Sequence, residues 1–363
     1  MTTLAELTAA PATAPIDSSP APSNAVRDRL GRPLKSLRVS VIDKCNLRCT
    51  YCMPEAEYNW LPKADVLTFD EISRLIDVFA GLGVDKVRLT GGEPLLRTGM
   101  ADLVRRIAAK PAITDIALTT NGVLLAPVVD ELLAAGLNRI TVSLDTLQPE
   151  RFRAISQRDS HSAVLAGIYA TAASGSSNFK LDTVLERGVN DDEIVPLIEF
   201  AKTVGAEIRF IEYMDVGGAT KWDPNRVFSR REIVERVAAH YGGAVPMAAV
   251  DAAPADRYQL PDGTTIGIIS STTQPFCSTC DRSRLTADGM WYRCLYAQKG
   301  VDLRGPMRGG DSDELLTAQI ASLWLLRNDR GAEDRLAATE RRAYLPLSTL
   351  KADPHLEMHT RGG

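Results

Sequence analysis

Three of the six cysteines in this chain lie within eight residues, in the sequence CNLRCTYC. Cys45, Cys49 and Cys52 are separated by three and then two residues, and their neighbours are too polar for ordinary core packing. Three soft thiolates from one short loop suit an iron–sulfur cluster. A [4Fe–4S] cluster has four irons, so one iron stays open for an external ligand. The alternative is zinc with a fourth ligand from elsewhere, but no histidine lies nearby.

The other three cysteines form a second group, Cys277, Cys280 and Cys294, with two and then thirteen residues between them. Two odd-numbered local groups favour metal or cluster ligation over disulfides, which need pairs. By itself the second group also fits a zinc ribbon that lacks one ligand. Thiolates held in this way predict a reducing compartment, and we therefore expect the protein in the cytoplasm.

Composition is that of a soluble enzyme, with 45% hydrophobic and 24% charged residues among 363. The net charge of −4 predicts no nucleic-acid partner and no anionic membrane partner, so any anion site must be local. No apolar run is long enough to cross a bilayer. Residues 1–28 are rich in Ala, Pro, Thr and Ser and lack the features of a secretion signal. We expect them to form a disordered tail.

Short β-branched runs alternate with amphipathic helical patterns over roughly residues 37–211. The pattern predicts strands at 37–41, 86–89, 115–119, 139–143, 180–184 and 207–211, and helices at 69–82, 100–109, 128–135 and 191–204. This alternation predicts a parallel sheet with right-handed crossovers. Periodicity alone leaves open whether the sheet curls into a partial barrel or lies as an open doubly wound sheet.

Polar and glycine-rich segments follow most of the predicted strands. The first strand leads into the cysteine loop, and later strands lead into TGGEP, TNG, SLD and EYMDVGG. In a parallel β/α enzyme the site is expected at the carboxyl ends of the strands. After about residue 243 the alternation weakens.

CNLRCTYC followed by GGEP at the next strand end resembles the radical S-adenosylmethionine (SAM) superfamily. The resemblance implies that the first cluster binds SAM through its open iron and reduces it to a 5′-deoxyadenosyl radical. It also implies contacts to SAM from Tyr51, Gly92, Glu93, Ser143 and Met214, with Glu93 supporting the geometry of the GGEP element.

The sequence CSTCDRSRLTADG and the final Gly-Gly together resemble the GTP 3′,8-cyclase family of molybdenum cofactor biosynthesis. The resemblance covers roughly residue 37 to the end. It implies a lyase that takes the ribose C3′ hydrogen of GTP and joins C3′ to guanine C8, giving (8S)-3′,8-cyclo-7,8-dihydroguanosine 5′-triphosphate. Cys277, Cys280 and Cys294 would hold a second [4Fe–4S] cluster, whose open iron binds the guanine.

The same resemblance implies further functional residues. GTP would be bound by six side chains, Arg38, Arg88, Thr119, Lys180, Arg282 and Arg284. The terminal Gly362 and Gly363 would reach into the pocket and be needed for turnover. Two departures from the family pattern bear on the tail: Arg361 stands where the family is often apolar, and DGMWYRCLY is a bulkier approach to Cys294 than usual.

The family fold is a partial (β/α)6 TIM-like barrel with a C-terminal α+β region that carries the second cluster. The expected organisation is a tail at 1–28, a radical SAM barrel at 29–243, a second-cluster and GTP-binding region at 244–349, and a C-terminal tail at 350–363. Implied partners are a flavodoxin- or ferredoxin-like electron donor and the downstream cyclic pyranopterin monophosphate synthase, with the chain a monomer or a homodimer.

Two other hypotheses remain. The first is a different twin-cluster radical SAM enzyme, such as a peptide-modifying maturase, although those usually carry more cysteines in their C-terminal part. The second is a non-catalytic zinc or iron–sulfur binding module. Iron and sulfide content would distinguish a zinc module from the enzymes, because a zinc module holds neither.

Overall fold

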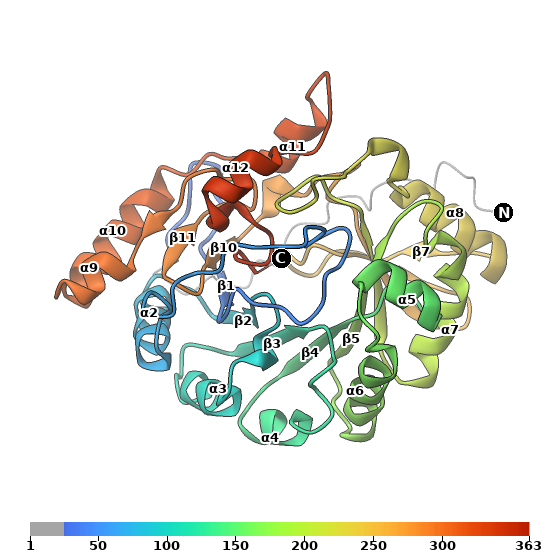
Figure 1. Cartoon of the computed structure of the whole chain (residues 1–363), viewed down its shortest axis with the longest axis horizontal. Helices are drawn as coiled ribbons and strands as arrows, with labels where there is room; N and C mark the ends of the chain where they lie inside the picture. The colour runs from blue at the N-terminus through green and yellow to red at the C-terminus, as the bar shows by residue number, and fades with distance from the viewer. Residues whose placement is uncertain (1–24, 363) are drawn as a thin grey trace.

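The computed structural model describes residues 25–362 and contains one curved sheet with helices packed on its outer face (Figure 1). The first six strands lie side by side in chain order and pair in parallel: β1 Ser36–Ser40, β2 Lys86–Thr90, β3 Asp115–Thr120, β4 Arg139–Ser143, β5 Phe179–Leu185 and β6 Glu207–Glu212. A doubly wound sheet would reverse its strand order at one point. Because the order does not reverse, the sheet is a partial barrel.

The fold class predicted from the sequence is therefore confirmed, and all six predicted strands are present with their ends shifted by at most one residue. The helices that follow these strands are α2 Phe69–Gly81, α3 Met100–Ala108, α4 Val129–Ala134, α5 Pro149–Ser156, α6 His161–Ala173, α7 Ile194–Thr203 and α8 Arg230–Tyr241. Helix α2 begins with a capping box in which the Thr68 side chain accepts from the Glu71 backbone and Glu71 accepts from the Thr68 backbone. The predicted helix at 191–204 begins as a 3-10 turn, Asp191–Glu193, before α7.

The C-terminal region adds strands to both edges of this parallel sheet, which the sequence pattern did not predict. Strand β9 (Thr265–Ile269) pairs in parallel with β6, and β10 (Arg282–Leu285) pairs in parallel with β1. Antiparallel strands continue each edge: β8 Asp256–Gln259 and β7 Val245–Pro246 beyond β9, and β11 Met290–Tyr292 and β12 Val301–Asp302 beyond β10. Residues 244–349 thus share one sheet with the preceding barrel.

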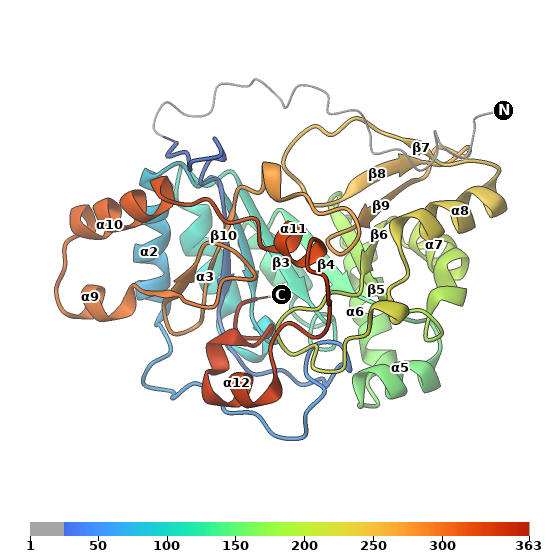
Figure 2. The same cartoon turned by 90° about the horizontal axis from the view of Figure 1, so that it is seen from above.

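Four helices follow β12: α9 Arg304–Arg308, α10 Asp313–Leu325, α11 Gly331–Leu336 and α12 Leu347–Ala352. Helix α10 packs against α2, and the last residues turn back toward the middle of the barrel (Figures 1 and 2). No helix within residues 25–362 is both long and apolar enough to cross a lipid bilayer.

Residues 25–28, which the sequence prediction assigned to the tail, pack against the rest of the protein. The Val26 amide donates to the Leu82 carbonyl at 3.2 Å, and Arg27 forms a β-bridge with Pro33. Asp28 is buried. The remainder of that predicted tail, residues 1–24, lies outside the described residues.

Candidate active site

A cavity of about 1070 Å³ runs through the barrel and is lined by all six cysteines. Single small-molecule sites are typically about 300–1000 Å³, so this cavity has room for more than one ligand. Cys45, Cys49 and Cys52 follow the carboxyl end of β1, whereas Cys277 and Cys280 precede the amino end of β10. Because β10 runs parallel to β1, the two cysteine groups lie at opposite ends of the strands.

The loop that carries the first cysteine group is held against the GGEP segment by close backbone contact. The Gly92 amide donates to the Ile42 carbonyl and the Glu93 amide to the Lys44 carbonyl, both at 2.8 Å. A Cβ on Gly92 would lie 2.3 Å from the Lys44 carbonyl oxygen, so only glycine permits this approach. The residue immediately before Cys45 is thereby fixed relative to the end of β2.

Glu93 is fully buried, and its carboxylate is bound by protein donors behind the cavity wall. It accepts from the Leu95 amide at 3.0 Å, the Asn121 amide at 2.8 Å and the Thr120 hydroxyl at 2.7 Å. Burial raises the pKa of Glu93 to about 7, although these hydrogen bonds oppose the shift. Glu93 therefore joins the ends of β2 and β3, a positioning role consistent with the one expected for it.

Replacing Glu93 with glutamine should destabilise the protein by about 2 kcal/mol, because an amide group cannot accept from all three donors. Chemical denaturation would measure the free energy of unfolding. We also expect weaker SAM binding, because the GGEP segment would shift relative to the cysteine loop. Asp70→Asn, which alters an exposed carboxylate on α2, is the control. Wild-type stability and SAM affinity in Glu93→Gln would contradict this role.

Three other residues expected to contact SAM line the same end of the cavity, namely Tyr51, Ser143 and Met214. The Tyr51 hydroxyl donates to Asp145 at 2.8 Å, and the Val184 amide donates to the other oxygen of Asp145 at 2.9 Å. Burial raises the pKa of Asp145 to about 6. The sequence reasoning missed Asp145, although it stands in the SLD segment that was singled out.

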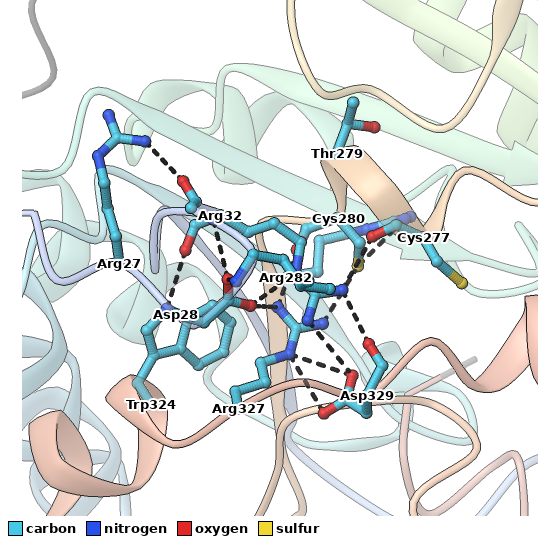
Figure 3. Close-up of polar contacts among 12 residues, drawn as sticks. Arg27, Asp28, Arg32, Cys277, Thr279, Cys280, Arg282, Trp324, Arg327 and Asp329 are labelled. Atoms are coloured by element: carbon cyan, nitrogen blue, oxygen red, sulfur yellow. Dashed lines mark hydrogen bonds and ion pairs between the residues drawn. The ribbon is translucent and has the colours of Figure 1, made fainter.

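The second cysteine group sits among arginines (Figure 3). Arg282 and Arg327 each place a guanidinium nitrogen 3.7 Å from the Cys280 sulfur. Burial would raise the pKa of the Cys280 thiol, but the two positive charges outweigh it and lower the pKa to about 7. Burial raises the pKa of Cys294 to about 11. The arginines therefore favour the thiolate at Cys280.

Between the two cysteine groups, three arginines stand in a row on adjacent strands. In the strand register Arg38 pairs with Arg284 on one side and with Arg88 on the other. Burial lowers the pKa of Arg88 and of Arg284 to about 10, and burial together with the other two arginines lowers that of Arg38. Arg284 is buried, Arg38 and Arg88 are half-buried, and the nearby carboxylate of Asp182 offsets their mutual repulsion only in part. The row is therefore suited to a polyanionic ligand.

The remaining expected GTP contacts lie in the same cavity. Arg88 donates to the Thr119 hydroxyl at 2.8 Å, and Arg282 and Lys180 line the cavity wall. Burial lowers the pKa of Lys180 to about 8. The sequence reasoning missed several other charged residues that line this wall: Lys86, Arg139, Arg209, Arg257 and Asp182. A charged residue between two apolar residues of a strand, such as Arg209 between Ile208 and Phe210, is the signal that could have identified them.

The C-terminal tail reaches the arginine row. The Gly362 carbonyl accepts from Arg284 at 2.8 Å and from Arg38 at 3.4 Å. Gly362 has a φ of +66°, and a Cβ on it would lie 2.3 Å from the Thr90 methyl carbon. Gly363 lies outside the described residues.

Arg361 and the segment DGMWYRCLY, which both depart from the family pattern, contact each other. The Arg361 guanidinium lies 4.2 Å from the ring centre of Tyr292, and it donates to the Leu295 carbonyl at 2.7 Å. Tyr292 and Leu295 belong to the bulky approach to Cys294. An arginine before the final glycines is thus accommodated by an aromatic partner, and the tail remains inside the barrel.

The two cysteine groups fit iron–sulfur ligation in three respects. All six thiols are free, and each group lines the cavity from a short stretch of backbone. Glycines make room beside them: a Cβ on Gly218 would lie 2.0 Å from the Cys52 carbonyl oxygen, and one on Gly331 would lie 3.1 Å from the Cys294 sulfur. Within residues 25–362, no three His, Cys, Asp or Glu side chains converge as ligands of a single metal ion.

Two known families match consecutive parts of the chain. Residues 39–201 match the Radical SAM superfamily, and residues 206–333 match the family described as Molybdenum Cofactor Synthesis C. The first match covers strands β2 to β5 and the first cysteine group, and the second covers β6 to β12 and the second group.

Curated relatives match nearly the whole chain. The chain is 59% identical to GTP 3′,8-cyclase 1 of Mycobacterium tuberculosis, covering 95% of this chain and 97% of that protein. It is 41% identical to GTP 3′,8-cyclase of Staphylococcus aureus, covering 86% of this chain and 94% of that protein. Among solved structures, Streptococcus suis SuiB bound to S-adenosylmethionine is similar in fold, with a TM-score of 0.57 at 15% identity over 84% of this chain and 69% of that one.

Proposed function

The chain belongs to the GTP 3′,8-cyclase family of radical SAM enzymes, and from that premise we propose that it converts GTP to (8S)-3′,8-cyclo-7,8-dihydroguanosine 5′-triphosphate. This reaction is the first step of molybdenum cofactor biosynthesis. The observation that carries the proposal is the row of Arg284, Arg38 and Arg88 between two cysteine groups in one cavity. A cationic centre between two cluster sites suits a nucleoside triphosphate whose ribose must face SAM at one end and whose base must face the second cluster at the other.

The cofactors are SAM and two [4Fe–4S] clusters. We assign the first cluster to Cys45, Cys49 and Cys52, and the second to Cys277, Cys280 and Cys294. When bound, the first cluster and SAM supply the 5′-deoxyadenosyl radical that removes the ribose C3′ hydrogen of GTP. Backbone of the GGEP segment at Gly92 would bind the methionyl part of SAM. Tyr51, Ser143 and Met214 would enclose its nucleoside part.

GTP would lie between the SAM-binding end and the second-cluster end of the cavity. Arg38, Arg88 and Arg284 would neutralise the triphosphate, with Lys180, Arg282 and Thr119 completing the polar wall. Guanidinium groups are suited to this role because their planar N–H pairs match phosphate oxygens. The guanine would face the second cluster, so that the base and the ribose C3′ are held by opposite parts of the cavity. Such fixed orientation is the protein's main contribution to ring closure.

The Gly362–Gly363 end would complete the cavity wall beside the substrate. Its carbonyl contacts with Arg38 and Arg284 orient two of the phosphate-binding cations. We assign SAM binding to residues 29–243, the second cluster and the GTP contacts Arg282 and Arg284 to residues 244–349, and this orienting role to the tail at 350–363. The other GTP contacts would come from the barrel. Strands from both larger regions line the one cavity.

Because cluster thiolates require a reducing environment, we place the enzyme in the cytoplasm. A flavodoxin- or ferredoxin-like protein would supply electrons, and cyclic pyranopterin monophosphate synthase would consume the product. No nucleic acid or membrane partner is part of the proposal, and the enzyme would act as a monomer or homodimer.

Anaerobically reconstituted protein incubated with SAM, dithionite and GTP should yield 5′-deoxyadenosine and a cyclised guanine nucleotide, both measured by liquid chromatography and mass spectrometry. Omitting GTP should leave only slow, uncoupled 5′-deoxyadenosine formation. If GTP has no effect on that rate and no guanine-derived product forms, the cyclase assignment is wrong. A peptide-modifying maturase would give that negative result while still cleaving SAM. A zinc module would contain no iron and cleave no SAM.

A further inference from the structure

A network of mostly buried charged residues lies beside Cys277 and Cys280 of the second cysteine group (Figure 3). Its members come from distant parts of the chain: Asp28 and Arg32 precede β1, and Arg327 and Asp329 follow α10. The side chains of Asp28, Arg32 and Arg327 are at most 2% exposed. Two carboxylates and two guanidinium groups give the network no net charge.

Asp28 organises the two arginines. One of its oxygens accepts from the Arg32 Nε at 2.6 Å and lies 3.5 Å from an Arg327 nitrogen. The other accepts from the backbone amides of Leu30 and Arg32, both at 2.9 Å. Asp329 accepts from the Arg327 Nε at 3.2 Å. Arg327 also stacks on Trp324, with the guanidinium carbon 4.4 Å from a ring centre. Both guanidinium groups are therefore held in fixed orientations.

Both arginines also donate hydrogen bonds to the cysteine loop, and Arg32 donates in addition to the Asp329 carbonyl at 2.9 Å. Arg32 donates to the Cys277 carbonyl at 2.8 Å, and Arg327 donates to the Cys280 carbonyl at the same distance. Arg327 also places its other terminal nitrogen 3.7 Å from the Cys280 sulfur. Cys277 and Cys280 are thus fixed through their backbone carbonyls, and Cys280 is fixed through its sulfur as well.

We propose that Arg327 is a positioning residue for the second cluster. Arg327 fixes Cys280 and donates a hydrogen bond to the Cys280 sulfur, while Asp28 and Arg32 hold Arg327 and Cys277 in place. A hydrogen bond to a ligating sulfur stabilises the reduced cluster, which carries more negative charge, and so raises its reduction potential. Arg282 also approaches Cys280, but it lines the cavity. Arg327 lies outside the cavity wall and does not serve as a substrate contact.

This inference rests on the proposed function, because it requires a cluster on Cys277, Cys280 and Cys294. The test therefore uses the full chain with Cys45, Cys49 and Cys52 replaced by alanine, so that only the second cluster is observed. Iron and sulfide content would be measured first, followed by a redox titration monitored by electron paramagnetic resonance. If this parent protein binds no cluster, the cofactor assignment fails and the inference fails with it.

In that parent, Arg327→Met should move the reduction potential of the second cluster to a more negative value or cause the cluster to be lost. Arg327→Lys should have a smaller effect, because lysine keeps the charge but cannot bond both the carbonyl and the sulfur of Cys280 with one planar group. Asp28→Asn should shift the potential in the same direction, since it loosens Arg327. Arg231→Met is the control, because Arg231 is an exposed residue of α8 that lies outside the cavity wall and pairs with Glu235.

With all six cysteines present, Arg327→Met should lower GTP conversion about 10–100-fold, as is typical for residues that support metal ligands. SAM binding at the other end of the barrel should stay at the wild-type level, which shows that the variant is folded. An unchanged potential, spectrum and iron content in Arg327→Met would overturn the proposal. An equal effect of Arg231→Met would also overturn it.

Discussion

Replacing Cys294 with alanine is expected to abolish conversion of GTP while SAM binding is retained. The loss should be complete, because the second cluster would keep only two protein ligands and the guanine would lose its metal contact. Iron content should fall from about eight to about four per chain, since each [4Fe–4S] cluster holds four irons. SAM binding should persist because the first cysteine group lies at the opposite end of the parallel strands.

Isothermal titration with SAM and product analysis would measure the two effects separately. Cys45→Ala is the matched control: it should lose SAM binding and all 5′-deoxyadenosine formation but keep the second cluster. If Cys294→Ala loses SAM binding as well, the two sites are not independent. If it still cyclises GTP, the second cluster has no role in the reaction.

Replacing Gly362 with alanine is expected to reduce GTP conversion by about a hundredfold, as small misplacements of positioning groups do. The new Cβ would lie 2.3 Å from the Thr90 methyl carbon, and the φ of +66° is unfavourable for any residue with a side chain. The tail must therefore move, and its carbonyl would leave Arg38 and Arg284. Because the rest of the barrel is untouched, the melting temperature and the iron content should stay at the wild-type values.

A second substitution tests whether this particular contact is responsible. Thr90→Ser removes the methyl group that the new Cβ would strike, so the double variant Gly362→Ala, Thr90→Ser should recover part of the lost activity. Recovery should be incomplete because the backbone strain remains. Thr90→Ser alone should be close to wild type. Full activity in Gly362→Ala would show that the tail position described above is not needed for turnover.

Much of the candidate site could be predicted because its signals are local. The spacing of Cys45, Cys49 and Cys52 indicates cluster ligation without any knowledge of the fold, since one short loop supplies all three thiols. The six strands of the barrel were also predictable, because alternating β-branched and amphipathic segments depend only on neighbouring residues. Resemblance to a known family then supplied the arginines that we propose as GTP contacts and the role proposed for the tail.

Other features were missed because they have no local signal. Strands β9 and β10 are short and no α-helix separates them, so nothing in their sequence indicates that they join the parallel sheet. Asp28 was assigned to a tail, although it is buried against Arg32 and Arg327. Arg139 and Arg209 were overlooked, because a charged strand residue is exposed to solvent in most sheets and faces a cavity only when the sheet curls.

By itself the sequence predicted the first set of cluster ligands from cysteine spacing and the six barrel strands from periodicity, whereas the second cluster and the partial barrel were implied by the family resemblance. Only the tertiary structure decided where these parts lie relative to one another. Parallel pairing of β10 with β1 puts the second cysteine group at the far end of the cavity and aligns Arg284 with Arg38. The physical reason is that strand pairing joins residues more than two hundred positions apart, and the register of that pairing depends on which edges of the sheet are free.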